Sequence, residues 1–226
     1  MAHDTEGLIY RLADRLEPVR PLARPAVRMA MWLAISVPYV VIVTVAMSSR
    51  LHASIRPLGA RFLIEQFAAL ATGVTAAGAA FASVVPGSDR RLVLLPVLLL
   101  TLWLGSVGQG CVGDWIQQGS NGLVVRPDWP CVFGIIMVGA VPAIAMAIML
   151  RCGARLTPHL TTALGGLAAA GLGDFGLRFV HQDASVMVLT WQLGSVFGLS
   201  AATSLAGPLL LKRNVSLKRD VMFRRA

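Results

Sequence analysis

The sequence predicts an all-α integral membrane protein, a bundle of six transmembrane helices that follows a short amphipathic helix in a cytoplasmic N-terminal tail. Of its 226 residues, 56% are hydrophobic and only 14% are charged, and the mean hydropathy is +0.70. A soluble domain of this size could not keep so much apolar surface away from water. Six apolar runs are also long enough to cross a hydrocarbon layer of about 30 Å as helices.

The N-terminal tail, residues 1–27, contains the predicted amphipathic helix. Its apolar residues recur at spacings of three and four and share one helical face: Leu8, Ile9, Leu12 and Leu16. The polar face mixes both signs, with Arg11, Asp14, Arg15 and Glu17. A helix of about three turns is marginal alone in water, so it needs the membrane surface, the protein's own loops or another protein to pack against. Because lipid-seeking helices are usually dominated by Lys and Arg, the mixed charge favours a protein partner. A plain juxtamembrane helix without a partner is the alternative.

The six apolar runs define a transmembrane domain over residues 28–210. We place the spans at 28–47, 62–85, 91–109, 131–150, 160–179 and 186–210. Small residues crowd three of them, in the segments GVTAAGAA, GGLAAAGLG and GSVFGLSAATSLAG, and should let helix backbones approach closely. Prolines fall inside three runs, at Pro38, Pro96 and Pro142. Tryptophans near span ends predict interfacial anchors: Trp32, Trp115 and Trp129.

The basic residues predict the orientation of the bundle. Fifteen of the 20 Lys and Arg residues lie in the two tails and in the second and fourth loops when Arg28 is counted with the N-terminal tail and Arg91 with the second loop, and the C-terminal tail, residues 211–226, is basic. Positive charge concentrates on the cytoplasmic side, so both termini should be cytoplasmic. That bias, together with contact with anionic lipid of the bilayer, accounts for the net charge of +9. Direct nucleic-acid binding is therefore not predicted, despite a pI near 10.9.

Two cysteines flank the third loop, on the predicted outer side, where thiols can oxidise. Cys111 should cap the third span and Cys131 should start the fourth, at about the same depth. A disulfide between them would contribute on the order of 3 kcal/mol. The alternatives are two unpaired thiols packed at helix ends, or a metal or thiol sensor that adds ligands from nearby: Asp114, Asp128, His181 and Asp183. The spacing matches no dedicated zinc motif, so the metal is left unassigned.

Ionisable residues inside the spans are costly and need partners. Arg178 follows Asp174 by four residues, which predicts an ion pair within the fifth span, and Glu65 lies one turn into the second. No chain of such groups continues through the inner half, which argues against a transporter. The sequence also contains no HExxH, nucleophile elbow or phosphate loop, so we expect neither an enzyme nor a bound cofactor.

Three segments together resemble one family, the NrsF-type family of bacterial inner-membrane proteins, which are six-helix anti-sigma factors. They are LIYRLADRLEPVRPL before the first span, GQGCVGDW after the third and HQDASVMVLTWQLG at the start of the sixth. The residues that match the second segment are Cys111, Asp114 and Trp115. Those that match the third are His181, Asp183, Met187, Trp191 and Gly194. Cys131 resembles the family's second outer cysteine.

The resemblance implies that the protein holds an extracytoplasmic-function sigma factor at the inner membrane and releases it when heavy metal or oxidant stresses the envelope. Leu8, Ile9, Leu12 and Leu16 would then form the docking face for the sigma factor, with Arg11 and Arg15 tuning the fit, and Cys111 and Cys131 would be candidates for sensing. Some members carry a cysteine after the histidine of the last segment, where this chain has Gln182. The rival functions are a small-solute transporter or channel, and a structural membrane protein without a sigma partner.

Overall fold

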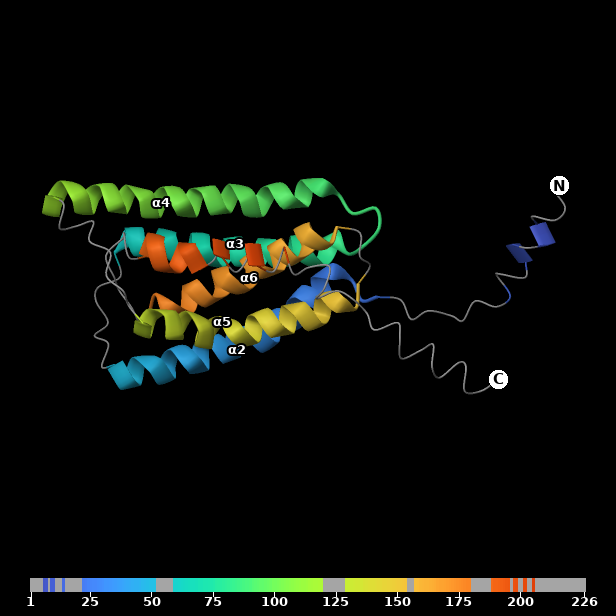
Figure 1. Ribbon diagram of the computed structural model, residues 1–226, viewed down its shortest axis with the longest axis horizontal. Helices are drawn as coiled ribbons and strands as arrows, with labels where there is room; N and C mark the ends of the chain where they lie inside the picture. The colour runs from blue at the N-terminus through green and yellow to red at the C-terminus, as the bar shows by residue number, and fades with distance from the viewer. Residues whose placement is uncertain are drawn as a thin grey trace.

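Five long helices make up most of the described chain in a computed structural model of the protein (Figure 1). The structure describes residues 6–7, 9–10, 14, 22–51, 59–119, 129–153, 157–179, 188–195, 197–198, 201–202 and 205, and within these residues there is no β-strand. In chain order the elements are α2 (Pro25–Leu51), α3 (Ala60–Ser83), the 3-10 helix η1 (Arg90–Val93), α4 (Leu94–Gln118), α5 (Trp129–Arg151), α6 (Pro158–Leu177) and the six-residue π-helix η3 (Val188–Leu193).

The first five predicted spans coincide with helices that are long and apolar enough to cross a membrane. The chain is therefore a membrane protein whose described part is all helical. The predicted sixth span, 186–210, is described only in part, and the predicted tail helix falls mostly outside the described residues, so both stay predictions.

The third span is longer than the predicted 91–109. Helical hydrogen bonding continues to Gln118 although the hydropathy falls, and it stops at Gly119, whose φ of +62° suits glycine. Cys111, Asp114 and Trp115 therefore lie on α4 and not in a loop.

Pro96 stands in the first turn of α4, where its missing N–H would have no helical partner in any case.

Helices that follow one another along the chain run antiparallel, and α6 packs against α3, α5 and α2. Figure 1 shows α4 on one side, α2 and α5 on the other, and α3 and α6 between them. Most residues of α6 are buried. We call the end of the bundle at which α2 begins "the tail end". The opposite end, at which α6 stops, is "the loop end". The Ser83 and Thr161 hydroxyls lie 2.7 Å apart and join α3 to α6 at the tail end.

Small residues let α3 and α6 touch through their backbones; the sequence predicted such close approach but not which helices meet. A Cβ atom added to Gly171 would lie 3.0 Å from the carbonyl oxygen of Ala69 and 3.1 Å from the backbone of Gly73. A Cβ atom on Gly73 would lie 3.1 Å from the backbone nitrogen of Leu172. Close contact over many atoms stabilises helix pairs in lipid, where the hydrophobic effect gives no attraction between helices. The crossing of α3 and α6 is therefore the tight centre of the bundle.

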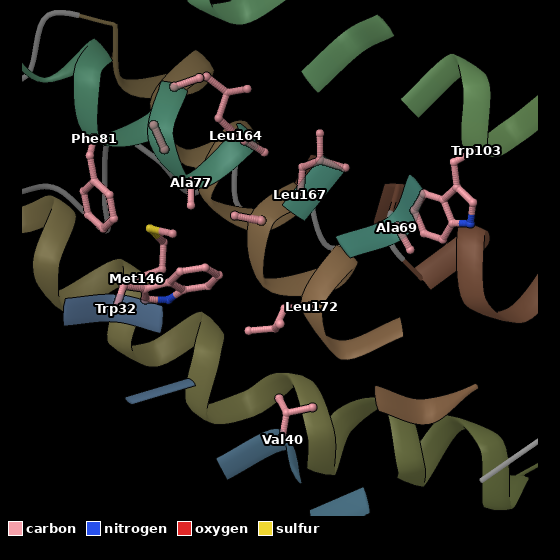
Figure 2. Packing of buried hydrophobic residues seen from close by; sticks show 14 of the residues in the cluster. Trp32, Val40, Ala69, Ala77, Phe81, Trp103, Met146, Leu164, Leu167 and Leu172 are labelled. Atoms are coloured by element: carbon pink, nitrogen blue, oxygen red, sulfur yellow. The ribbon is translucent and has the colours of Figure 1, made fainter. Parts of the chain in front are cut away.

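Side chains of α2 join α5 by donating hydrogen bonds to backbone carbonyls. The Trp32 indole donates to Pro142 at 3.0 Å, the Tyr39 hydroxyl donates to Met137 at 2.6 Å, and the Arg28 guanidinium donates to Met149. Figure 2 shows Trp32 next to Met146, within the hydrophobic core. Trp32 is fully buried, so its prediction as an interfacial anchor is wrong; the indole N–H reaches a carbonyl of α5 and not the water boundary. Trp115, 55% exposed, is consistent with an anchor.

Long apolar side chains cover the outer faces of the bundle. Ile42 on α2, Leu98 on α4 and Ile136 on α5 are all more than half exposed. Such faces would be unfavourable in water, but they suit contact with lipid chains. Lipid therefore completes the burial of these helices.

The α3–α6 contact predicts that two glycine substitutions have different effects on the stability of the protein. Gly171→Ala should lower the free energy of unfolding by about 1–3 kcal/mol, because its new methyl group meets backbone atoms that cannot move aside. Gly108→Ala on α4, whose Cβ would meet nothing within 4 Å, should leave the stability unchanged or raise it slightly. Unfolding of the purified chain by SDS in mild detergent measures both. Equal effects at the two sites would contradict the close contact.

Candidate functional site at the loop end

A buried carboxylate holds two arginines together at the loop end of the bundle. Glu65 on α3 accepts a hydrogen bond from Arg178 through Oε2 at 2.5 Å, and one from Arg61 through Oε1 at 2.9 Å. The side chain of Glu65 is 5% exposed and that of Arg178 is 10% exposed, whereas Arg61 is 48% exposed. The pair between Glu65 and Arg178 therefore lies inside the protein, and Arg61 connects it to the surface. We call Arg61, Glu65, Asp174 and Arg178 the charged cluster.

Local structure explains why these groups meet. Arg61 and Glu65 are four residues apart on α3 and so face the same way. Arg178 follows the last residue of α6, where its backbone N–H bonds to the carbonyl of Asp174 at 3.1 Å, and a cation at a helix C-terminus is stabilised by the helix dipole. Since α3 and α6 are antiparallel, the start of one lies beside the end of the other.

Aromatic rings pack against the ion pair. The Phe62 ring lies 5.8 Å from the Arg178 guanidinium, a cation–π distance. Phe62 also packs edge-on against Phe179, and Phe179 packs edge-on against Phe175. These rings keep water away from the guanidinium, which strengthens its attraction to Glu65.

The predicted ion pair between Asp174 and Arg178 is wrong, because the Arg178 guanidinium bonds to Glu65 on the neighbouring helix. Asp174 lies one turn earlier on α6 and is 6% exposed. Its Oδ1 atom is buried, and no described residue donates a hydrogen bond to it. Asp174 remains near enough to Arg178 and Glu65 to interact with their charges. Sequence spacing alone favoured the pair within one helix, since it could not show that α3 lies beside α6.

Cys111 lies beside the charged cluster. Its thiol on α4 is close enough to Arg61, Glu65 and Asp114 to interact with their charges, and the residue is half-buried. Within the described part of the chain, Cys111 forms no disulfide. The structure thus brings the predicted sensing thiol and Asp114 together with Glu65, which the sequence analysis had treated as a separate feature.

Several predicted outer-face residues lie outside the described residues, namely Asp128, the side chain of Cys131, His181 and Asp183. The disulfide and the metal alternative therefore stay predictions. Among the residues that the structure does describe, no three His, Cys, Asp or Glu side chains are placed to hold a metal ion. Trp191 on η3 is partly buried and packs against the hydrophobic core.

The predicted docking face for a sigma factor also lies mostly outside the described residues, with Leu8, Arg11, Leu12, Arg15 and Leu16. Ile9 is described; it is helical and 59% exposed.

Arg28 at the tail end was missed by the sequence analysis, which counted it with the polar tail. It is 4% exposed, lies 4.8 Å over the Phe81 ring of α3 and bonds to a carbonyl in the last turn of α5. The first turn of α2, directly after the tail, is thus fixed against α3 and α5. The exposed Cys152 lies near Arg28, at the opposite end of the bundle from Cys111. An arginine at the edge of an apolar run is the only signal that could have suggested a buried role.

Because of the ion pair, two conservative substitutions in the charged cluster should differ greatly in their effect on stability. Glu65→Gln should lower the free energy of unfolding by about 3–5 kcal/mol, because it removes the carboxylate that is bonded to the buried Arg178 guanidinium. Arg61→Gln removes an exposed partner of the same carboxylate and should cost about 1 kcal/mol or less. SDS-induced unfolding again compares the variants.

A third variant, Glu65→Leu with Arg178→Met, should recover most of the stability lost in Glu65→Gln, since apolar groups replace both charges. If this double variant were less stable than Glu65→Gln, the ion pair would not be the source of the effect.

Comparison with known proteins identifies a family for this chain. A search of curated proteins and a search of solved structures each gave no significant match. The family model described as NrsF, negative regulator of sigma F, matches residues 12–212, which include part of the tail, all five described spans and the segment of the predicted sixth. With nearly the whole chain matched, the protein belongs to the NrsF family of negative regulators of a sigma factor.

Proposed function

We propose that the protein is a membrane-bound anti-sigma factor of the bacterial inner membrane, which sequesters an extracytoplasmic-function sigma factor and releases it under envelope stress by heavy metal or oxidant. The observation that carries the proposal is the family match, because one model covers both the membrane bundle and the part of the tail that contains Leu12 and Leu16. Both tails face the cytoplasm in this proposal, as their basic residues favour.

The tail is the proposed sigma-binding element. Ile9 and Tyr10 are helical and more than half exposed, so apolar surface is available to a partner there. An amphipathic helix typically binds by inserting its apolar face into a groove of the partner. Leu8, Ile9, Leu12 and Leu16 would enter that groove, and Arg11 and Arg15 would contact its rim.

The proposed signal begins at Cys111. Oxidation with Cys131 would transfer two electrons to the oxidant and release two protons, whereas capture of a metal ion would add positive charge and require the thiolate. Either event changes the charge or the position of a side chain that interacts with Arg61 and Glu65. It would therefore act on the ion pair that joins α3 to Arg178.

Helix α3 connects this site to the tail. Its first turns carry Arg61 and Glu65, and its last turn carries Phe81, which lies under Arg28 at the start of α2. A shift of α3 at the loop end would reach Arg28 and thus the segment that leads directly into the tail. We describe the result as a population shift between a form that holds the sigma factor and a form that releases it.

The docking face is tested by co-purification of the full-length chain with its sigma factor in gentle detergent. The double substitution Leu12→Asp and Leu16→Asp should abolish recovery of the sigma factor, because charges would enter an apolar interface. Leu22→Asp provides the matched control, since Leu22 is an exposed leucine of the same tail outside the proposed face. Full recovery of the sigma factor with the double variant would refute the docking face, and absence of a sigma factor from the unchanged protein would refute the function.

The sensing step is tested by exposing cells to cadmium or diamide and measuring transcription from a sigma-dependent promoter. Cys111→Ser and Cys131→Ser should each block the response, because serine neither forms a disulfide nor binds soft metal ions as a thiolate does. Cys152→Ser, at the other end of the bundle, should respond normally. A normal response by both Cys111→Ser and Cys131→Ser would exclude these thiols as sensors.

A further inference from the structure

A cavity of about 480 Å³ lies between α5, α6 and the segment after η3. Its wall is formed mainly by residues with little or no side chain, among them Gly139, Ala143, Ala170, Gly173 and Gly198. The volume falls within the range of about 300–1,000 Å³ that is typical of small-molecule sites. The cavity shares Asp174 with the charged cluster, but neither Cys111 nor a residue of the tail lines it.

The open space is a consequence of the glycines. A Cβ atom added to Gly139 or to Gly198 would meet nothing within 4 Å. On the opposite wall, a Cβ atom added to Gly173 would only reach ordinary contact distance, 3.6 Å, from the Cα of Gly139. Larger residues would therefore fit at these positions and fill the space, and this chain has glycine instead.

Asp174 supplies the one charged side chain in the wall. It is 94% buried, being 6% exposed, and none of the described residues donates a hydrogen bond to its Oδ1 atom. A buried carboxyl oxygen without a partner is destabilising, and such a group in a cavity is a reason to expect a ligand that supplies the missing bond. The nearest cation, Arg178, is already bound to Glu65.

The composition of the wall indicates what kind of polar group the ligand carries. Asp174 is its one charged side chain, and most of the other lining residues are apolar. A charged ligand would have to lose its hydration in these surroundings, and an anionic one would also face Asp174 directly. A neutral hydroxyl group loses less hydration energy and donates a hydrogen bond to the carboxylate, and it can also accept one if Asp174 is protonated.

We propose that this cavity is a binding site for a neutral, apolar molecule that carries a hydroxyl group, with the hydroxyl on Asp174 and the hydrocarbon part against the glycines and alanines of α5 and α6. If each non-hydrogen atom takes up about 30 Å³, as a water molecule does, the cavity accommodates molecules of up to about 16 such atoms. An eight-carbon alcohol is within this limit.

Photolabelling of the full-length chain in lipid nanodiscs tests the proposal. The probe is an octanol that carries a diazirine on its chain, and mass spectrometry locates the labelled residues. Labelling of α5 and α6 around Asp174 should saturate with probe concentration and should be displaced by unlabelled 1-octanol. Labelling that rises linearly with probe concentration and is spread over all lipid-facing helices would overturn the proposal. This measurement uses the unchanged protein alone.

Two variants distinguish the cavity from lipid-facing surface. Gly139→Leu should reduce labelling around Asp174 to background, because leucine occupies the cavity. Gly105→Leu on α4 is the matched control, since a Cβ atom there also meets nothing within 4 Å but Gly105 does not line the cavity; its labelling should match the unchanged protein. Equal labelling in Gly139→Leu and Gly105→Leu would place the probe elsewhere.

The role of the hydroxyl group is tested with Asp174→Leu and with a diazirine-bearing octane. Loss of the hydrogen bond to Asp174 should weaken the affinity for the octanol about tenfold, while the octane should bind both proteins alike. If the octane labelled the unchanged protein as strongly as the octanol, the cavity would be a site for hydrocarbon chains only, and the proposed hydroxyl recognition would be wrong.

Discussion

The ion pair between Glu65 and Arg178 is the interaction on which the loop end of this bundle depends. Both side chains are largely buried inside the protein, where water cannot solvate their charges, so each requires the other, and the segments that carry them must meet at one relative position. From Glu65 to Ser83 is 18 residues along α3, and from Arg178 back to Thr161 is 17 along α6. At 1.5 Å per residue these lengths are about 27 and 26 Å. The ion pair at one end and the hydroxyl pair at the other therefore agree on a single register, and the glycine crossing lies between them.

The same pair explains the state of Asp174. On an isolated helix Asp174 would have Arg178 as its natural partner, one turn away. The guanidinium bonds instead to Glu65, and the carboxyl of Asp174 is left facing the cavity. The ion pair expected within one helix is thus replaced by an ion pair between helices. The buried carboxyl of Asp174 is left without Arg178 as its bonded partner. Departures of this kind from local rules tend to coincide with functional sites.

Membrane character, five of the spans and the close approach of helices through small residues could be predicted from the sequence, because each depends on composition along one helix; that α3 packs against α6 could not. The charged cluster could not be predicted, because it depends on which helices are neighbours. The four-residue spacing favoured an ion pair between Asp174 and Arg178. Only the adjacency of α3 and α6 shows that Arg178 pairs with Glu65. Cys111 was expected at a span end because hydropathy falls there, whereas backbone hydrogen bonding continues to Gln118. Trp32 near a helix start has the sequence position of an anchor, yet its N–H reaches α5.

The packing also limits how a signal can pass through the bundle. Among the described elements, α4 packs mainly against α3, so in the proposed signalling a change at Cys111 would act chiefly on α3. The backbone contact between Gly73 and Gly171 leaves no room for α3 to move closer to α6, because the atoms that meet are main-chain atoms. Rotation or a small slide of α3 along α6, the shear-like motion of packed helices, would keep this contact. Such a motion carries Phe81 with it, and Phe81 lies against Arg28 at the first turn of α2. A tail attached to that turn is therefore placed where a shift of α3 has the shortest route to it.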